Sequence, residues 1–355
     1  MARLEDVARE AGVSASTVSR ALSRPGMVAP ATLERVRAAA DGLGFRVNPA
    51  ARALITGRTG FFAMLVPDLE NPFYAASIAA AQDLAAQRER RLLIAVTDGS
   101  AQREQAAVHD LEEQVDGFIL LSPVAGTTEL KDLHRRKPVV VINRKVPGLT
   151  SFTVDTPGGL ARIYDRLVEL GHTDVAYLAG PPGSWMDRRR RATLAEHAGA
   201  PGLRVHIRGP VPPSFTEGAR ATADLLATGC TAILAYNSLL ALGVMFELGR
   251  CGVRVPHDIS VAAADDMAFA GLPGEPITAV HAPAPDLGRH AVAALIEMAG
   301  DASGRRPAGR TLPTTVRLTA TLAAPRSAGQ AGPVTAGGER TGRRDDPAGQ
   351  AVDPR

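Results

Sequence analysis

Carboxylates and amides follow several apolar runs of this 355-residue chain. The residues at these places are Asp68, Asp98, Asn143, Asp155, Asn237 and Asp265. Ligands of open parallel sheets bind beyond the carboxyl ends of the strands, so these side chains could line one site. Carboxylates accept hydrogen bonds from hydroxyl groups, and amides both donate and accept. The set therefore indicates a site for a neutral polyol, although each isolated Asp could equally cap a helix.

A second polar group lies in the stretch GVSASTVSRAL, residues 12–22. Gly12 permits a tight turn, and Ser14 can cap a helix that buries Val18 and Leu22. The outward face would then carry Ala15, Ser16, Thr17, Ser19 and Arg20. Small hydroxyl side chains and one arginine suit close approach to a polar, negatively charged surface.

Acid–base catalysis has two candidate pairs, Asp265 with Asp266 and His172 with Asp174. Adjacent residues on a strand point to opposite faces, so Asp265 and Asp266 cannot easily share one substrate. The sequence also contains no P-loop, no GxGxxG after the first apolar run, no GxSxG and no HExxH. We therefore expect neither an enzyme nor a cofactor or metal site.

The helices predicted around residues 12–22 form a small helical head at the start of the chain. Apolar spacing predicts a first helix over 4–11 and a third over 31–43, with Leu33, Val36, Ala40 and Leu43 inward. Two short helices joined by a turn with Gly, followed by a third helix, describe a helix-turn-helix. Residues 1–58 hold nine Arg against five acidic residues, a charge of +4, while the whole chain carries +3. A basic head on a near-neutral body indicates a head that binds nucleic acid.

The rest of the chain repeats a strand-then-helix pattern. Continuous apolar runs predict buried parallel strands covered by helices, including helices over 72–89, 157–171, 215–228 and 238–251. These runs are FFAMLV, RLLIAV, GFILL, PVVVI, VAYLAG, AILAY and ISVAAA. Residues 324–355 are rich in Gly, Pro, Ala and Arg without periodicity, which predicts a disordered tail.

The sequence resembles the lac repressor family of bacterial transcription regulators from residue 3 to about 323. The motifs that carry the resemblance are LEDVAREAGVSASTVSRAL, GFRVNPAARALITGRT, NPFY, VDTPGG, GHTDVAYLAGPPGS, NSLLALG, DISVAAADD and ITAVHAP. The resemblance implies a small all-α helix-turn-helix head plus hinge helix, joined to an α/β core of two parallel-sheet subdomains (periplasmic binding protein-like, type I).

The expected domain boundaries follow from this resemblance. Residues 1–47 would form the head, 48–59 the hinge helix and linker, and 60–323 the effector-binding and dimerisation core. Lobe 1 of the core would comprise about 60–157 plus 284–308, and lobe 2 about 158–283 plus 309–323.

The resemblance also assigns DNA-binding residues. Ala15, Ser16 and Arg20 would choose the base sequence, with Arg20 as the main base reader. Ser14, Thr17 and Ser19 would bind phosphates. In the hinge, Leu54 would enter the minor groove with Ala51 beside it, and Asn48 and Arg52 would approach the backbone.

For the effector, the resemblance implies Arg190 as a positive anchor, Asn237 and Asp265 as hydroxyl binders, and Phe73 and Tyr74 on the opposite wall. Trp185 and Phe215 could stack on a sugar face, and Asp68 and Asp155 complete the expected set. The sequence departs from the family at Ser238, which replaces an Asp, and at Ala263 and Ala264, which replace Gly-Tyr. Four consecutive arginines at 188–191 leave the assignment of Arg190 open by one or two positions.

These observations predict a homodimeric repressor that binds a near-palindromic double-stranded DNA operator under control of a small sugar-like effector. The alternative is an activator, or a regulator of a non-sugar effector such as a nucleoside or purine. A transport-type binding protein would need a signal peptide and no helical head. The charged N-terminus and the lack of about 18 consecutive apolar residues predict a cytoplasmic protein without a membrane segment.

Overall fold

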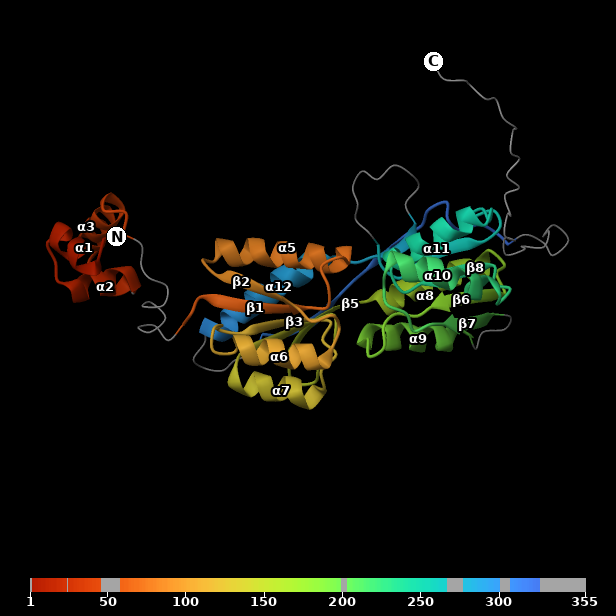
Figure 1. The fold of residues 1–355 in the computed structure, drawn as a ribbon, viewed down its shortest axis with the longest axis horizontal. Coiled ribbons are helices and arrows are strands. Elements are labelled where there is room, and N and C mark those ends of the chain that lie inside the picture. Colours follow the sequence, from red (N-terminus) through yellow and green to blue (C-terminus); the bar gives the residue numbers. More distant parts are fainter. Residues whose placement is uncertain are drawn as a thin grey trace, which may run out of the picture. The chain divides into compact units, whose positions relative to one another are not determined.

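The computed structural model describes residues 2–23, 25–45, 58–198, 203–266, 277–300 and 307–325. Its first part is a head of three α-helices, α1 (Leu4–Ala11), α2 (Ala15–Ser23) and α3 (Pro30–Gly42), with a 3₁₀ turn at Pro25–Met27 (Figure 1). Gly12 has φ +63°, which is the left-handed geometry predicted for the turn between α1 and α2. The predicted helix-turn-helix is confirmed.

The core of the head differs from the prediction in three positions, one of which is Leu33, predicted to point inward but only half-buried. Val18 and Val36 are fully buried as expected, but Ala21 takes the buried place predicted for Leu22, which is half-buried. Leu43 is 39% exposed because it lies just beyond the end of α3, where the helical spacing no longer directs it inward.

The chain divides into two compact units, each of which contains a six-stranded sheet, and the head is counted with unit 1. Unit 1 contains a sheet of order β11-β5-β4-β3-β1-β2 in which every pair is parallel. Its strands are β1 (Phe61–Val66), β2 (Arg91–Val96), β3 (Phe118–Leu121), β4 (Val139–Ile142), β5 (Thr150–Val154) and β11 (Arg310–Leu312). The run RLLIAV forms the edge strand β2, which is only half-buried, so its prediction as a fully buried strand was wrong.

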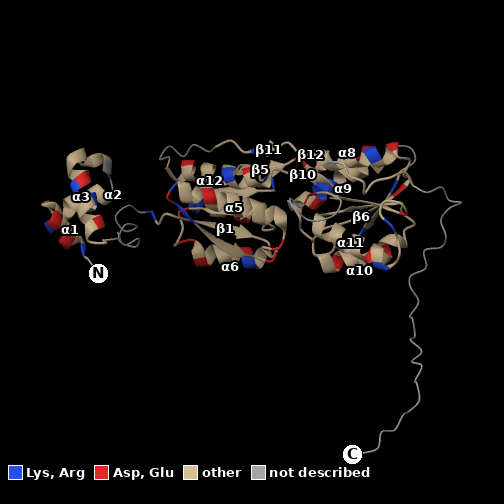
Figure 2. Ribbon diagram, turned by 90° about the horizontal axis from the view of Figure 1, so that it is seen from above, with Lys and Arg blue, Asp and Glu red and all other residues tan. Residues whose placement is uncertain are grey.

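Helices cover both faces of the unit 1 sheet (Figure 1). The helices α5 (Pro72–Gln87) and α12 (Ala284–Gly300) share one apolar cluster with the strands. On the opposite face, α6 (Ala101–Leu111) and α7 (Thr127–Arg136) pack through Leu130, Leu133 and partly buried Val108. In Figure 2 the ribbons of helices such as α6 and α12 carry red and blue positions, whereas β1, which lies beside the edge strand β2, is tan because its sequence FFAMLV contains no charged residue.

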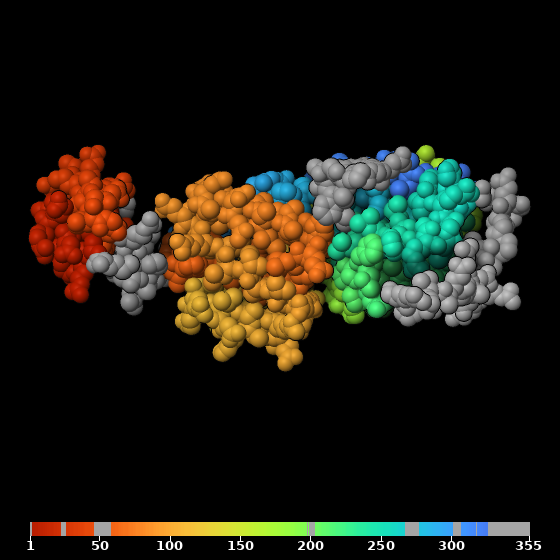
Figure 3. Space-filling view, turned by 45° about the horizontal axis from the view of Figure 1, so that its top comes forward, coloured from red at the N-terminus to blue at the C-terminus, as the bar shows by residue number. Residues whose placement is uncertain are grey.

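Unit 2 repeats the plan with a sheet of order β12-β10-β9-β8-β6-β7, parallel except for the β10–β12 pair. Its strands are β6 (Asp174–Leu178), β7 (Arg204–Arg208), β8 (Ala232–Ala235), β9 (Ser260–Ala263), β10 (Thr278–His281) and β12 (Thr315–Arg317). The helices α10 (Phe215–Leu226) and α11 (Ser238–Arg250) cover one face, and α8 (Thr156–Glu169) and α9 (Trp185–Ala198) contribute to the cluster on the other. In the space-filling view, the side chains of α11 form much of the teal surface of this unit (Figure 3).

The unit boundaries differ from the lobes predicted from the sequence. Unit 1 comprises 1–155, 183–188 and 282–314, and unit 2 comprises 156–182, 189–281 and 315–355. Residues 309–314 were therefore wrongly assigned to lobe 2, because β11 pairs with β5 of the first sheet. Residues 183–188 were wrongly assigned in the same way, since Met186 is buried in the apolar cluster of unit 1.

His172 is buried in unit 2 and contacts Ala323, close to the last residue that the structure describes. His172 Nδ1 lies 2.7 Å from Thr231 Oγ1, and His172 Nε2 lies 2.9 Å from the Ala323 carbonyl. A neutral ring satisfies both contacts, with Nε2–H donating to the carbonyl and Nδ1 accepting from the hydroxyl. Burial lowers the pKa of His172, although the Ala323 carbonyl opposes this shift.

This contact predicts a pH-dependent stability. The folded state binds fewer protons at His172 than the unfolded state, so its stabilisation is complete above the ordinary histidine pKa and falls as the pH drops below it. We expect His172→Gln to lower the free energy of unfolding by about 2 kcal/mol at about pH 8 and to reduce the loss between about pH 8 and 5.5. Urea unfolding at both pH values measures this effect. The exposed His257→Gln is the control, and an unchanged pH dependence in His172→Gln would contradict the assignment.

Within the described residues, no helix combines the length and apolar character needed to cross a membrane.

Candidate functional site

The start of α2 carries the predicted hydroxyl cluster. Ser14 Oγ accepts from the backbone N–H of Thr17 at 3.2 Å, which confirms Ser14 as a capping residue. The same oxygen lies 2.9 Å from the hydroxyls of both Ser16 and Thr17. Three hydroxyl groups are thus gathered at the amino end of α2, where backbone N–H groups also favour an anion such as phosphate.

Arg20 lies one turn further along α2 and is exposed. Its Nε donates to the Ser16 carbonyl at 3.2 Å, which orients the guanidinium along the helix surface. Ser16 is also exposed, whereas Thr17 and Ser19 are half-buried. Ala15 was expected on the outward face, but it is half-buried against the core of the head because it begins the helix directly beside α1 and α3. The exposed part of the predicted DNA-binding face is therefore narrower than expected and consists of Ser14, Ser16 and Arg20.

The predicted hinge residues Asn48, Ala51, Arg52 and Leu54 lie outside the described residues, as does nearly all of the predicted tail.

Unit 2 gathers three of the predicted effector residues in a buried polar cluster. Arg190 is 4% exposed and makes three hydrogen bonds within the unit. Its Nε donates to Thr156 Oγ1 at 3.1 Å, and its two terminal nitrogens donate to the carbonyls of Tyr236 at 2.6 Å and Ala264 at 3.3 Å. The guanidinium carbon also lies 4.9 Å from the centroid of the Tyr236 ring. Arg190 therefore joins the loops that follow β8 and β9.

Asn237 and Asp265 stand at the ends of these two strands. Asn237 caps α11, since its Oδ1 accepts from Leu240 N at 3.0 Å. Asp265 Oδ1 accepts from both the backbone N–H and the hydroxyl of Ser238, at 2.9 and 3.0 Å. Ser238, the residue that departs from the family pattern, thus orients the carboxylate of Asp265.

The cluster contains one buried polar group whose hydrogen-bonding capacity is unused. Asn237 is 1% exposed, and its Nδ2 has no hydrogen-bond partner among the described residues. The cap bond of Oδ1 fixes which end of the amide is the nitrogen. A buried unsatisfied donor costs about 1–3 kcal/mol, so a ligand acceptor at this point would be favourable. Burial raises the pKa of Asp265, while the positive charge of Arg190 partly opposes this effect.

Burial also distinguishes the four consecutive arginines. Arg190 is buried, whereas Arg188 and Arg189 are exposed and Arg191 is half-buried. Arg190 is the arginine that reaches the Tyr236 and Ala264 carbonyls, so it is the one within the polar cluster.

Phe215 lies elsewhere in unit 2. It begins α10, is 43% exposed, and its ring centroid lies 5.4 Å from that of Phe246 on α11, which is 54% exposed. The sequence could not identify this partner because Phe246 is 31 residues away.

In unit 1, the predicted residues occupy the carboxyl end of the sheet and the adjoining core. Phe73 and Tyr74 are buried in the apolar cluster against which Trp185 also packs. Asp68 Oδ1 accepts from the backbone N–H groups of Glu70 and Asn71, at 3.0 and 2.7 Å, so it stabilises the turn that precedes α5, whose N-cap is Asn71. Asp155 follows β5 and is exposed.

Two further polar residues, Ser122 and Asn143, meet at the carboxyl end of this sheet. The sequence predicted Asn143 at such a site but not Ser122. Ser122 follows β3 and Asn143 follows β4, with φ values of +51° and +61°. Asn143 Nδ2 donates to Ser122 Oγ at 2.8 Å. Positive φ is uncommon for residues other than glycine and often marks functional sites. The polar residue directly after the run FILL was the available signal for Ser122.

The alternative catalytic pairs are not brought together. His172 contacts Thr231 and Ala323, whereas the Asp174 carboxylate binds Arg204 and His206. Asp265 contacts Ser238, whereas Asp266 contacts His281 at 2.8 Å. Within each proposed pair, the two side chains thus bind different partners.

Comparisons with known proteins agree with this arrangement. Residues 3–48 match the family described as bacterial regulatory proteins, lacI family, and residues 164–320 match the periplasmic binding protein-like domain. The transcriptional regulator GalS of Salmonella typhimurium is 31% identical over 80% of this chain and 86% of its own length. The lac repressor dimer bound to operator and ONPF has 25% identity and a TM-score of 0.78, covering 91% of this chain and 99% of that structure.

A third relative is the transcriptional regulator CelR in complex with cellobiose, at 26% identity and a TM-score of 0.64, covering 90% of this chain and 100% of that one. The chain therefore belongs to the lacI family of bacterial regulatory proteins and is a DNA-binding transcription regulator with an effector-binding core, not an enzyme.

Proposed function

We propose that this regulator is a dimeric cytoplasmic repressor whose operator affinity is controlled by a neutral, sugar-like effector bound at Asn237 and Asp265. The observation that carries the proposal is the buried, unsatisfied Asn237 Nδ2 in the same polar cluster as the Asp265 carboxylate. One donor and one acceptor suit a ligand hydroxyl, which can accept from the first and donate to the second.

The role of Arg190 favours a neutral effector. Three of its N–H groups donate within unit 2, and its guanidinium lies over the Tyr236 ring. An effector that required a strong cation would have to displace these contacts. CelR, whose structure contains cellobiose, supports a sugar; a nucleoside or purine remains the competing class.

DNA recognition is assigned to α2. Arg20 would read a base, since an arginine can bind guanine through two hydrogen bonds worth about 1–3 kcal/mol of discrimination. Ser14, Ser16 and Thr17 would fix the register on phosphates. A symmetric dimer presents two copies of α2, so the operator should be near-palindromic.

The pair Phe215 and Phe246 supports homodimerisation through α10 and α11. Gly243 and Gly218 let these helices approach closely, because a Cβ at Gly243 would lie 2.0 Å from the Phe215 carbonyl oxygen and one at Gly218 would lie 2.2 Å from that of Leu240. The close approach places two half-exposed aromatic rings side by side on the surface. Burial of such rings against a second copy would remove a large apolar area from water.

This surface predicts a change of oligomeric state. Phe246→Glu should weaken dimerisation at least ten-fold, because a carboxylate would lose its hydration in an apolar interface. Sedimentation equilibrium measures the dimer dissociation constant. Val168→Glu is the matched control, since Val168 is 46% exposed on α8. A Phe246→Glu dimer as strong as the unmodified one would exclude this surface.

The experiment that tests the function is an effector screen by thermal unfolding. A ligand at 100 times its Kd stabilises the folded state by about 2.7 kcal/mol, which raises the melting temperature measurably. We expect a neutral mono- or disaccharide to stabilise the full chain, and Asn237→Ser to abolish the shift while still capping α11. Stabilisation by nucleosides or purine bases alone would contradict the sugar assignment. A sugar that stabilises Asn237→Ser equally would contradict the site.

A further inference from the structure

One carboxylate of unit 1 binds the segment Thr59–Gly60, which joins the linker to β1. Asp116 lies between α6 and β3, 57 residues from Thr59, and its side chain is 7% exposed. Its Oδ1 accepts from the backbone N–H of Thr59 at 2.7 Å and from the Thr59 hydroxyl at 3.0 Å. Its Oδ2 accepts from the backbone N–H of Gly60 at 3.0 Å and from Arg90 Nη1 at 3.2 Å. Three of these four hydrogen bonds therefore come from the end of the linker.

The backbone of this segment follows a defined path into the sheet. Gly60 has φ +79°, a conformation that residues with side chains rarely adopt. Its carbonyl accepts from the backbone N–H of Arg91 at 3.0 Å, which continues the pairing of β1 with β2. The Thr59 hydroxyl oxygen in turn accepts from the backbone N–H of Phe61 at 3.2 Å. The chain is thus fixed to unit 1 from Thr59 onward.

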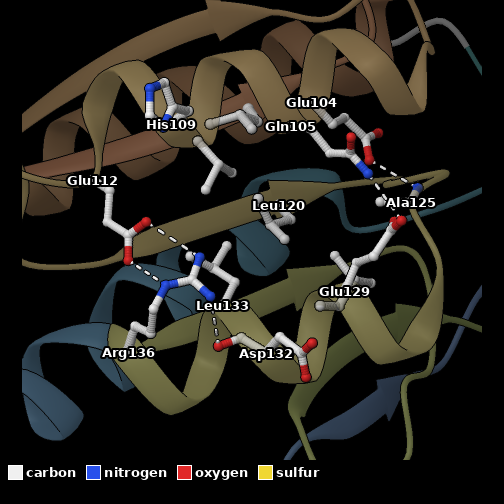
Figure 4. A pocket seen from close by; sticks show the side chains of 13 residues that line it. Glu104, Gln105, His109, Glu112, Leu120, Ala125, Glu129, Asp132, Leu133 and Arg136 are labelled. Carbon is white, nitrogen blue, oxygen red and sulfur yellow. Dashed lines mark hydrogen bonds and ion pairs between the residues drawn. The ribbon is translucent and has the colours of Figure 1, made fainter.

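Asp116 is itself held in place by the fold. Its backbone N–H donates to the Phe61 carbonyl at 2.7 Å, and the preceding Val115 is fully buried. Figure 4 shows that Glu112, at the start of the same connection, binds Arg136 of α7, through hydrogen bonds of 2.6 and 3.2 Å. The carboxylate therefore stands at a fixed point of unit 1 and can fix the linker to that point.

The place of this contact gives it a consequence for DNA binding. The chain from the head reaches unit 1 through Thr59 and Gly60, so their release would lengthen the tether of the head. Each released residue can add about 3.5 Å to an extended chain. One base pair of DNA rises about 3.4 Å, so two released residues correspond to about two base pairs for each head. Tether length also sets the effective concentration of a second head at its half-site.

We propose that Asp116 is a positioning residue for operator recognition. It clamps the carboxyl end of the linker to unit 1 and thereby restricts the spacing of the two half-sites that one dimer can bind. The proposal rests on the proposed function in one respect, the dimer that presents two heads to one operator.

The test compares Asp116→Asn with the unmodified full chain. Whichever way the new amide turns, two of the four hydrogen bonds lose their acceptor. Affinities are measured by fluorescence anisotropy on the selected operator and on versions with one or two base pairs inserted between the half-sites. The insertions should weaken the unmodified chain at least about ten-fold but Asp116→Asn only about three-fold. Asp110→Asn, on the exposed face of α6, is the matched control and should behave as the unmodified chain.

Two further measurements separate the clamp from the general stability of unit 1. A duplex with a single half-site should bind the unmodified chain and Asp116→Asn equally, because α2 is unchanged. Exchange of the Gly60 amide proton should be slow in the unmodified chain and at least about ten-fold faster in Asp116→Asn.

Thr59→Val tests the same clamp if Asp116→Asn fails to fold. It removes the hydroxyl that binds Asp116 but leaves the ion pair of Asp116 with Arg90, and it should tolerate the inserted base pairs better than the unmodified chain. Thr128→Val, at an exposed position of α7, is its control.

Three results would overturn the proposal: equal losses on the inserted operators in the unmodified chain and the variants, an unmodified chain that is insensitive to the insertions, or weaker binding of Asp116→Asn to the single half-site. A monomeric chain in sedimentation equilibrium would contradict the proposed dimer and with it the role in spacing. Rapid exchange of the Gly60 amide in the unmodified chain would contradict the clamp alone.

Discussion

Asp265→Asn should weaken effector binding about 10- to 150-fold while the chain remains folded. The substitution keeps Oδ1, which accepts from Ser238 N and Oγ, and replaces the other oxygen by an amide that cannot accept from a ligand hydroxyl. A hydrogen bond to a charged group contributes about 1.5–3 kcal/mol, so we expect a 10- to 150-fold loss of effector affinity by calorimetry.

Stability distinguishes this role from a purely structural one. The amide keeps the Oδ1 acceptor for Ser238, and the burial that raises the pKa of Asp265 is less costly for a neutral amide, so Asp265→Asn should leave the free energy of unfolding within about 1 kcal/mol. Asp224→Asn, on the exposed face of α10, is the matched control and should leave effector affinity unchanged. Unfolding of Asp265→Asn at markedly lower denaturant, with effector affinity retained, would show that Asp265 serves the fold instead.

Arg20→Ala should weaken binding to the operator by about 1–3 kcal/mol, a 5- to 150-fold effect, and relax the preference at one base pair of each half-site. The physical reason is the exposed guanidinium on α2, which the Nε bond to the Ser16 carbonyl orients along the helix. The operator is first obtained by selection from random duplexes with the full chain, and affinities are then measured by fluorescence anisotropy.

Two further variants distinguish recognition of a base by Arg20 from the general attraction of its positive charge to DNA. Arg20→Lys keeps the charge but not the planar pair of donors, so it should retain non-specific binding and still lose preference at that base pair. Arg37→Ala removes a charge from the exposed face of α3 and should leave sequence preference intact. An equal loss on operator and random DNA for Arg20→Ala would mean that Arg20 contacts phosphate alone.

The strands that the sequence predicted share continuous apolar side chains. Each of the seven apolar runs contains a strand of the structure, between β1 and β9, because strands buried on both faces exclude polar residues; the half-buried edge strand β2 is the exception. The strand β5 was missed because TSFTV contains three hydroxyl residues. Two of them are satisfied from far along the chain: Thr150 Oγ1 donates to the Pro307 carbonyl, and Thr153 Oγ1 lies 2.9 Å from Thr311 Oγ1. Hydrogen bonds between residues so far apart in the chain produce no pattern in the local sequence.

Only part of the candidate site could likewise be predicted from the sequence. The cap at Ser14 depends on residues within one turn of helix, so the sequence sufficed to predict it. The assignment of Arg190 among four arginines depends on carbonyls 46 and 74 residues away. The role of Ser238 in orienting Asp265 likewise required the fold, because it joins the ends of two separate strands.

The affinity of the unmodified full chain for its selected operator, with and without the sugar found in the thermal screen, tests the central claim most directly. If the effector at Asn237 and Asp265 controls the head, the two dissociation constants should differ by about 5- to 150-fold, the usual coupling of 1–3 kcal/mol. Equal dissociation constants, with a sugar that demonstrably binds at those residues, would contradict the account.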